Sequence, residues 1–420
     1  MKLLKQQKQV IVLYATTALG VLVGILSSVI NTRALPPDLF GNVRYVQNII
    51  SFVSSLLLVG FFVSGSRLLA LSKSEEYSRR IRGIMCVILA ITIGVVMLSM
   101  LVMYIYTRIK GENPGMPSLY LVAIPLCGTV LMLNYVNTTA QGDNHIGRIA
   151  VARLLPTSIY VVVAFFIYKK FGATPELMLW LYNGIATIVL VLVILSTKPS
   201  FTNLRESFVL LNEENRHYGF NVYLGSLADN ATGYVAGITL GFFCDTNSSV
   251  GFYTLAQTMA SPLAMLPAII GTTYFKRFAS EKCISRKVLF SSVFLTILSC
   301  IVFVFLIKYV VMFLYNEDYY QVATYSSWLA IASCMHGLGD MFNRYLGSQG
   351  QGKQLRNSSF AAGGVLLVGS IVLVYFFRIN GAIMTKILSS LVYLLMLCFY
   401  YIQFVKKQTC KNTASTIEIP

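Results

Sequence analysis

The chain has 420 residues, of which 56% are hydrophobic and only 12% are charged. Soluble domains carry about 25% charged residues, so this composition excludes a soluble globular protein and indicates a multi-pass membrane protein. The net charge of +17 is expected to lie in loops that face anionic lipid headgroups. We therefore expect membrane lipids as partners and no nucleic acid.

Twelve apolar stretches are long enough to cross a bilayer, which needs roughly 20 residues per helix. In chain order they cover residues 9–31, 42–66, 83–106, 118–140, 150–168, 177–197, 219–243, 250–273, 288–312, 320–345, 357–377 and 381–404. The stretch at 320–345 is the least apolar of the set. The pattern predicts an all-α integral membrane protein with twelve transmembrane helices and no soluble domain.

The longest predicted loop lies at the midpoint of the chain, at residues 198–218. Its short amphipathic stretch, 204–211, is typical of a helix that lies on a membrane surface. Since six spans precede this loop and six follow it, we predict an N-terminal lobe at 1–197, a linker at 198–218 and a C-terminal lobe at 219–405. A tail at 406–420 completes the chain.

Two pairs of short stretches repeat across the halves, in the same order and at nearly the same offset. Residues 40–47 (FGNVRYVQ) align with 250–257 (VGFYTLAQ), and 140–148 (AQGDNHIGR) align with 348–356 (SQGQGKQLR). The repeats suggest two similar halves, an arrangement typical of transporters whose substrate path lies between them.

The distribution of basic residues predicts how the chain is oriented. With the N-terminus inside, 24 of the 33 lysines and arginines fall on the inner side. Positive charge is retained on the cytoplasmic side, so both termini are expected to be cytoplasmic. An offset near 210 residues spans six helices, an even number, and the two lobes should therefore run parallel through the membrane.

Several of these segments resemble a known family. Residues 32–41 (TRALPPDLFG) resemble a signature of polysaccharide exporters, and so does the 250–256 segment (VGFYTLA). The loops at 140–148 and 348–356 are similar to the short loops that follow helices four and ten of the family. Together they resemble Wzx-type O-antigen flippases of the MOP superfamily of multidrug, oligosaccharidyl-lipid and polysaccharide exporters.

The resemblance implies a MATE-like architecture of two lobes around a central cavity, without a cofactor or a catalytic or metal site. Such proteins move undecaprenyl-pyrophosphate-linked O-antigen repeat units from the cytoplasmic to the periplasmic leaflet of the bacterial inner membrane. They work by alternating access. The energy for transport is usually attributed to H⁺ or Na⁺ gradients or to downstream consumption of the substrate. A polysaccharide polymerase and a chain-length regulator are the implied protein partners.

Four cations are candidates for the path of a pyrophosphate, since guanidinium groups bind phosphate oxygens bidentately. They are Arg33 and Arg44 near the first outer loop, Arg67 at the inner end of the second span, and Lys386 inside the twelfth. The alternative is that these side chains reach the lipid headgroups, which for Arg67 is favoured by its basic neighbours on the inner side.

Other polar residues within spans are candidates for a coupling ion or a wet cavity, because charge at mid-bilayer is costly. Asp229 and Asn230 lie in the seventh span, where they either bind H⁺ or Na⁺ or join helices. His336, Asp340 and Arg344 recur at one-turn spacing in the tenth span. That spacing favours an internal Asp340–Arg344 pair, and the histidine is either structural or a proton relay.

Three other functions fit parts of the pattern. A MATE-like drug/cation antiporter shares the helix count and buried carboxylates, but its cationic substrates suit an arginine-rich wall poorly. A lipid II flippase typically has two more C-terminal helices than are present here. A membrane-embedded polymerase or acyltransferase is disfavoured because the outer loops are short and the three histidines form no catalytic constellation. We therefore expect a transporter and not an enzyme.

Overall fold

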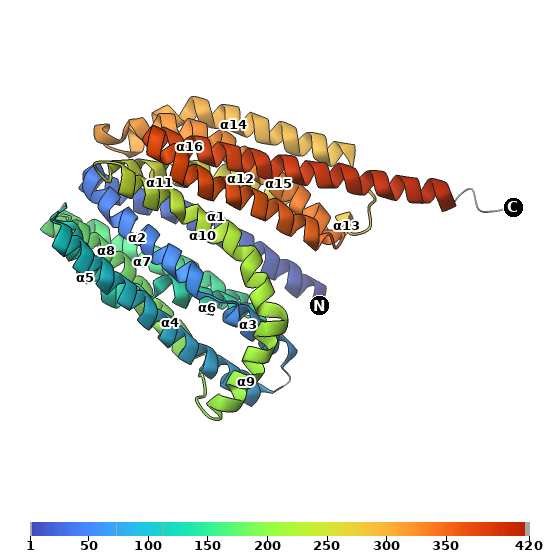
Figure 1. Cartoon of the computed structure of the whole chain (residues 1–420), viewed down its shortest axis with the longest axis horizontal. Helices are drawn as coiled ribbons and strands as arrows, with labels where there is room; N and C mark the ends of the chain where they lie inside the picture. Colours follow the sequence, from blue (N-terminus) through green and yellow to red (C-terminus); the bar gives the residue numbers. More distant parts are fainter. Residues whose placement is uncertain (1, 73, 112, 416–420) are drawn as a thin grey trace. The chain divides into compact units, whose positions relative to one another are not determined.

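The computed structural model describes residues 2–72, 74–111 and 113–415, and these residues are helical almost throughout (Figure 1). The α-helices are α1 (Lys2–Ala34), α2 (Pro37–Leu57), α3 (Phe61–Leu71), α4 (Glu75–Lys110), α5 (Met116–Ala123), α6 (Thr129–Gly142), α7 (Ile146–Phe171), α8 (Pro175–Ser196), α9 (Leu204–Glu214), α10 (Phe220–Phe243), α11 (Ser248–Ala260), α12 (Pro262–Thr273), α13 (Phe275–Phe278), α14 (Arg286–Leu314), α15 (Gln321–Ser348) and α16 (Gly352–Ser415). Two 3₁₀ turns, η1 (Ile124–Leu126) and η3 (Glu317–Tyr319), and one π-helical turn, η2 (Asn215–Gly219), join them.

All twelve predicted stretches fall on these helices. Among the described residues, seven helices are long and apolar enough to cross a membrane, or eight if the bent pair α2–α3 is one span. The predicted all-α membrane fold is confirmed, and the expected number of spans is consistent with the structure. Helix α15, which covers the least apolar stretch, is not among those seven.

Helix α4 shows how the sequence specifies a span and its ends. Ser74 caps its N-terminus by accepting a hydrogen bond from the Tyr77 N–H, and two glutamates occupy the first turn. Two basic residues lie in the last turn, and Gly111 ends the helix with φ of 67°. Both charge placements complement the helix dipole, and glycine adopts the left-handed conformation without steric cost.

Helix α16 consists of two helices that pack against each other in antiparallel orientation. Arg378 interrupts it with φ of 53° and ψ of −130°. The Ser389 hydroxyl donates to the Ala362 carbonyl (2.9 Å), and a Cβ on Gly381 would lie 2.0 Å from the Leu373 carbonyl oxygen. Residues on either side of the break are therefore in contact, which agrees with separate spans at 357–377 and 381–404.

The chain divides into two compact units. The first comprises Met1–Ile238 and Thr246–Gly251, and the second comprises Thr239–Asp245 and Phe252–Pro420. The loop predicted as a linker, residues 198–218, lies within the first unit, where it forms α9 and most of η2.

In the first unit, the π-helical turn η2 packs on the break between α2 and α3. These two helices meet at 58°, and the break includes Val59 (φ 41°) and Gly60 (φ 82°). Asn215 donates from Nδ2 to the Val59 carbonyl (3.1 Å) and accepts at Oδ1 from the Ser64 hydroxyl (3.2 Å). A β-branched residue with positive φ is strained, so these hydrogen bonds stabilise an unfavourable backbone conformation.

The first residues of the two copies of the first repeated motif meet within the first unit. A Cβ on Gly41 would lie 1.9 Å from the Asn247 carbonyl oxygen, and one on Gly251 would lie 3.1 Å from the Phe40 ring. Beside this contact, Asn247 Nδ2 donates to Asn42 Oδ1 (2.7 Å), and both side chains are buried. The glycines thus permit the N-terminal ends of α2 and α11 to touch.

A buried ion-pair network joins helix ends on the side predicted to be cytoplasmic. Arg82 contacts Glu75 (2.9 Å), Asp143 (2.9 Å) and the Thr197 carbonyl (3.0 Å), and its side chain is only 5% exposed. Arg148 binds the second Asp143 oxygen (3.1 Å). The guanidinium of Arg82 therefore connects α4 with the segments that follow α6 and α8.

Arg82→Gln should lower the free energy of unfolding by about 3 kcal/mol, because it leaves the buried Asp143 carboxylate only partly compensated. Arg80→Gln is the matched control, since Arg80 pairs at the surface with Glu76, which is 74% exposed. Exposed pairs of this kind contribute about 0–1 kcal/mol. The measurement is the melting temperature of each purified variant in detergent, and equal melting temperatures would contradict the role given to Arg82.

Candidate functional sites within the two units

The second unit holds a polar cluster between α15 and the C-terminal half of α16. The Tyr393 hydroxyl donates to Asp340 Oδ1 (3.1 Å) and accepts from Asn343 Nδ2 (2.9 Å). The His336 ring stacks on the Tyr393 ring, with centroids 4.7 Å apart and planes inclined by 19°. Lys386 and Asp340 both act electrostatically on His336. The structure thus brings together three of the predicted polar residues, His336, Asp340 and Lys386.

Gly339 of α15 allows this cluster to form. A Cβ on Gly339 would lie 2.6 Å from Cδ1 of Tyr393, so glycine at this position lets the tyrosine ring lie directly against α15. The ring then presents its hydroxyl to Asp340, the next residue. A carboxylate with a tyrosine donor and a neighbouring imidazole is a group that can bind and release a proton.

Arg344 does not complete the pair that its spacing suggests. Within the described residues, it forms no ion pair with Asp340; its side chain is exposed and its aliphatic part lies against Gly271 of α12. Asp340 uses the Tyr393 hydroxyl instead. Asn343 and Tyr393 are functional candidates that the sequence did not single out, although Asn343 lies on the same helix face as Asp340.

The first unit holds a second buried polar cluster, between α1 and α7. The Tyr160 hydroxyl donates to Asn31 Oδ1 and lies 3.0 Å from the Tyr168 hydroxyl. Tyr160 also packs edge-to-face on Tyr182 of α8, with ring centroids 5.1 Å apart. The Asn31 Nδ2 group is buried and has no hydrogen-bond partner in the described part of the chain. A buried donor of this kind is expected to bind a water molecule or a ligand oxygen.

Arg44 of α2 is half-buried and held in place by its own helix. Its NH1 donates to Gln47 Oε1 (2.9 Å), and its guanidinium lies over the Phe40 ring, 4.9 Å from the centroid. Arg44 Nε and Gln47 Nε2 are buried and have no hydrogen-bond partner within the described ranges. These groups offer a positive charge and N–H donors to a ligand rich in acceptor oxygens.

The remaining predicted residues lie apart from these clusters. Arg33 is exposed in the last turn of α1. Arg67 forms an ion pair with Glu214 and lies over the Tyr218 ring, 5.0 Å from its centroid, so it binds the linker. The side chains of Asp229 and Asn230 lie outside the described set.

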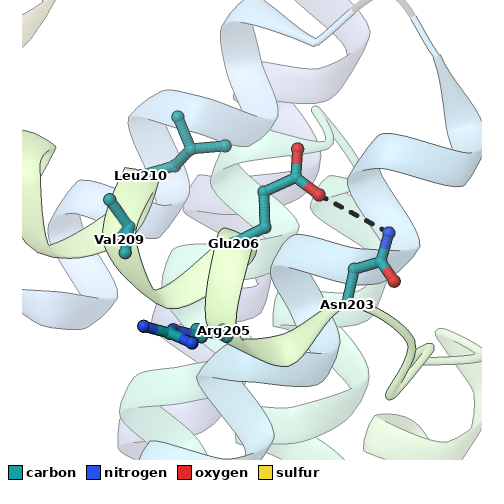
Figure 2. A pocket seen from close by; sticks show the side chains of 5 residues that line it. All are labelled: Asn203, Arg205, Glu206, Val209 and Leu210. Atoms are coloured by element: carbon teal, nitrogen blue, oxygen red, sulfur yellow. Dashed lines mark hydrogen bonds between the residues drawn. The ribbon is translucent and has the colours of Figure 1, made fainter.

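Helix α9 carries a surface hollow of about 640 Å³, shown in Figure 2. Figure 2 shows Asn203 and Glu206 joined by a hydrogen bond (3.5 Å), with Arg205, Val209 and Leu210 on the same helix. The predicted amphipathic stretch is thus a helix with exposed apolar and charged side chains. One helix supplies most of the lining, so the hollow is an open surface.

The fold matches solved transporter structures, although no family model and no curated protein matches the sequence. The lipid II flippase MurJ in an inward closed conformation aligns with a TM-score of 0.71 and 12% identity, covering 94% of this chain and 89% of that one. An inward-facing multidrug resistance MATE transporter of the MOP superfamily gives 0.70 and 12%, covering 92% and 96%. A eukaryotic MATE transporter gives 0.62 and 14%, covering 96% and 98%. The chain therefore has the fold of the MATE and MurJ membrane transporters.

Proposed function

We propose that the protein is a flippase for undecaprenyl-pyrophosphate-linked oligosaccharide repeat units of the O-antigen type. It moves them from the cytoplasmic to the periplasmic leaflet of the bacterial inner membrane by alternating access. The fold shared with MurJ and the exporter-like segments at 32–41 and 250–256 support this proposal.

The observation that carries the proposal is the set of unpartnered donors near the start of the chain. Asn31 Nδ2, Arg44 Nε and Gln47 Nε2 are all buried N–H groups without an acceptor among the residues that the structure describes. None of these three residues carries a carboxylate. A diphosphate with many acceptor oxygens complements such a set, whereas a cationic drug would require acceptors in its place.

Asp340 is the proposed coupling site within the described side chains. Its carboxylate takes up H⁺ or Na⁺, while Tyr393 and His336 hold it in position. Asp229 with Asn230 remains a second candidate, since a carboxylate in a predicted span needs a compensating partner. Lys386 is proposed to keep the surroundings of His336 electropositive, which favours an anionic substrate.

A MATE-like drug/cation antiporter is the second candidate function. It is favoured by the likeness to MATE transporters and by the Asp340 carboxylate within α15. The two functions differ in substrate charge, so a substrate-based experiment separates them.

Arg33→Ala combined with Arg44→Ala should reduce surface polysaccharide about tenfold or more, because a lost charge-assisted hydrogen bond contributes about 1.5–3 kcal/mol. Lipid-linked oligosaccharide should accumulate in the same cells. Arg108→Ala is the matched control, since Arg108 is exposed and its NH1 binds its own helix neighbour Tyr104 (2.8 Å). Quantitative immunoblotting confirms equal amounts of each protein in the membrane.

Two results would contradict the flippase proposal. One is wild-type surface polysaccharide in the double variant. The other is a gene deletion that changes drug sensitivity while lipid-linked oligosaccharide stays at its normal level, which would support the antiporter.

A further inference from the structure

A cavity of about 500 Å³ lies between α14 and α15 in the second unit, apart from the polar cluster around Asp340. Apolar side chains, including Val311 and Met312, form one part of its wall. Lys308, Thr324 and Ser327 supply a cation and two hydroxyl groups. The cavity therefore combines an apolar lining with a small polar region.

Lys308 lies among strongly exposed aromatic side chains of α14. The neighbouring Phe305, Tyr309 and Phe313 are 73%, 70% and 79% exposed in a helix apolar enough to cross a membrane. Lys308 makes no ion pair among residues 2–72, 74–111 and 113–415. A lysine in such a span needs an anionic partner or access to the headgroup region.

The position of Lys308 suits the headgroup region. Six residues separate it from Leu314, the end of α14, which is about 9 Å along a helix. Thr324 and Ser327 are three residues apart on α15 and so lie on one helix face. Tyr320, just before α15, adds a third hydroxyl to the lining.

We propose that this cavity binds an anionic glycerophospholipid. Its phosphate pairs with the Lys308 ammonium group and accepts a hydrogen bond from Thr324. The Ser327 hydroxyl, which donates to the Ala323 carbonyl (2.9 Å), keeps lone pairs for a glycerol hydroxyl. One acyl chain lies along Val311 and Met312. Charge complementarity and the adjoining apolar wall favour a lipid over a soluble anion, which would leave that wall uncovered.

The test is retention of lipid by the full-length protein, purified in a neutral detergent and measured by native mass spectrometry. Phosphatidylglycerol should bind the wild type about fivefold more tightly than phosphatidylcholine, since one lysine contributes about 1 kcal/mol toward an anionic lipid. Lys308→Gln should lose this preference. The control Lys170→Gln should keep it, because Lys170 already lies 5.1 Å from the centroid of the Phe171 ring.

Each further outcome decides the proposal. Thr324→Val should weaken phosphatidylglycerol binding without affecting phosphatidylcholine, and melting temperatures show that both variants are folded. An unchanged preference in Lys308→Gln would overturn the proposal, since snorkelling alone would then account for this lysine. Displacement of phosphatidylglycerol by excess inorganic phosphate would also overturn it, because the site would then recognise a free anion.

Discussion

Replacing Gly41 with alanine should lower the free energy of unfolding by about 2–4 kcal/mol. The new Cβ would lie 1.9 Å from the Asn247 carbonyl oxygen, a backbone atom that cannot rotate away. Overpacking costs about 1–3 kcal/mol, and an unsatisfied buried Asn42 or Asn247 would add about 1–3 kcal/mol. Alanine gains only about 1 kcal/mol over glycine in helix propensity, so the clash prevails.

The measurement is the melting temperature of the purified protein in detergent, which we expect to fall by about 2–5 °C. Gly94→Ala is the matched control, because Gly94 lies in the interior of α4 and a Cβ there would meet nothing within 4 Å. Its melting temperature should stay equal or rise. A Gly41 variant as stable as the Gly94 variant would show that the contact between Gly41 and Asn247 contributes nothing to stability.

The repeated motif predicted a likeness between two segments but not the contact between them at Gly41. The sequence shows that residues 40–47 and 250–257 are alike, and this likeness suggests two similar halves. It cannot show that the two copies touch, because the contact depends on tertiary packing of segments about 200 residues apart. Only the distances around Gly41 and Gly251 establish this.

Hydropathy predicted where the helices lie, because every stretch long enough to cross a bilayer must satisfy its own backbone hydrogen bonds. It did not predict the bend at Val59 and Gly60. That break is stabilised by Asn215, which lies far away in sequence and in the loop predicted as the linker between the halves. The composition around Val59 and Gly60 therefore cannot predict that Asn215 binds there.

The polar cluster in the second unit was predicted in part. One-turn spacing placed His336 and Asp340 on one face of a helix, and in the structure both side chains contact Tyr393. The same spacing favoured Arg344 as the partner of Asp340, but the carboxylate accepts from Tyr393 instead. Spacing within one helix cannot reveal a donor on another helix, and a tyrosine in an apolar span is more often a packing residue.

The proposed coupling role of Asp340 leads to the second large effect. Asp340→Asn should reduce ion-driven transport about a hundredfold or more, because an amide can still accept from Tyr393 but has no titratable proton. Protein stability should change by less than about 1 kcal/mol, since the neutral hydrogen bond to Tyr393 is retained. The measurement is flipping of a fluorescent lipid-linked oligosaccharide in proteoliposomes, with and without an imposed pH or Na⁺ gradient.

Two further variants separate coupling from structure. Tyr393→Phe removes the hydroxyl that binds Asp340, so it should weaken gradient-driven transport while leaving substantial activity, because the carboxylate itself remains. Arg344→Gln is the matched control, because Arg344 lies one turn from Asp340, is exposed and should leave both coupling and pH dependence unchanged. Gradient-driven transport that persists in Asp340→Asn would assign this carboxylate to helix packing. The coupling ion would then have to bind elsewhere, with Asp229 the next residue to replace.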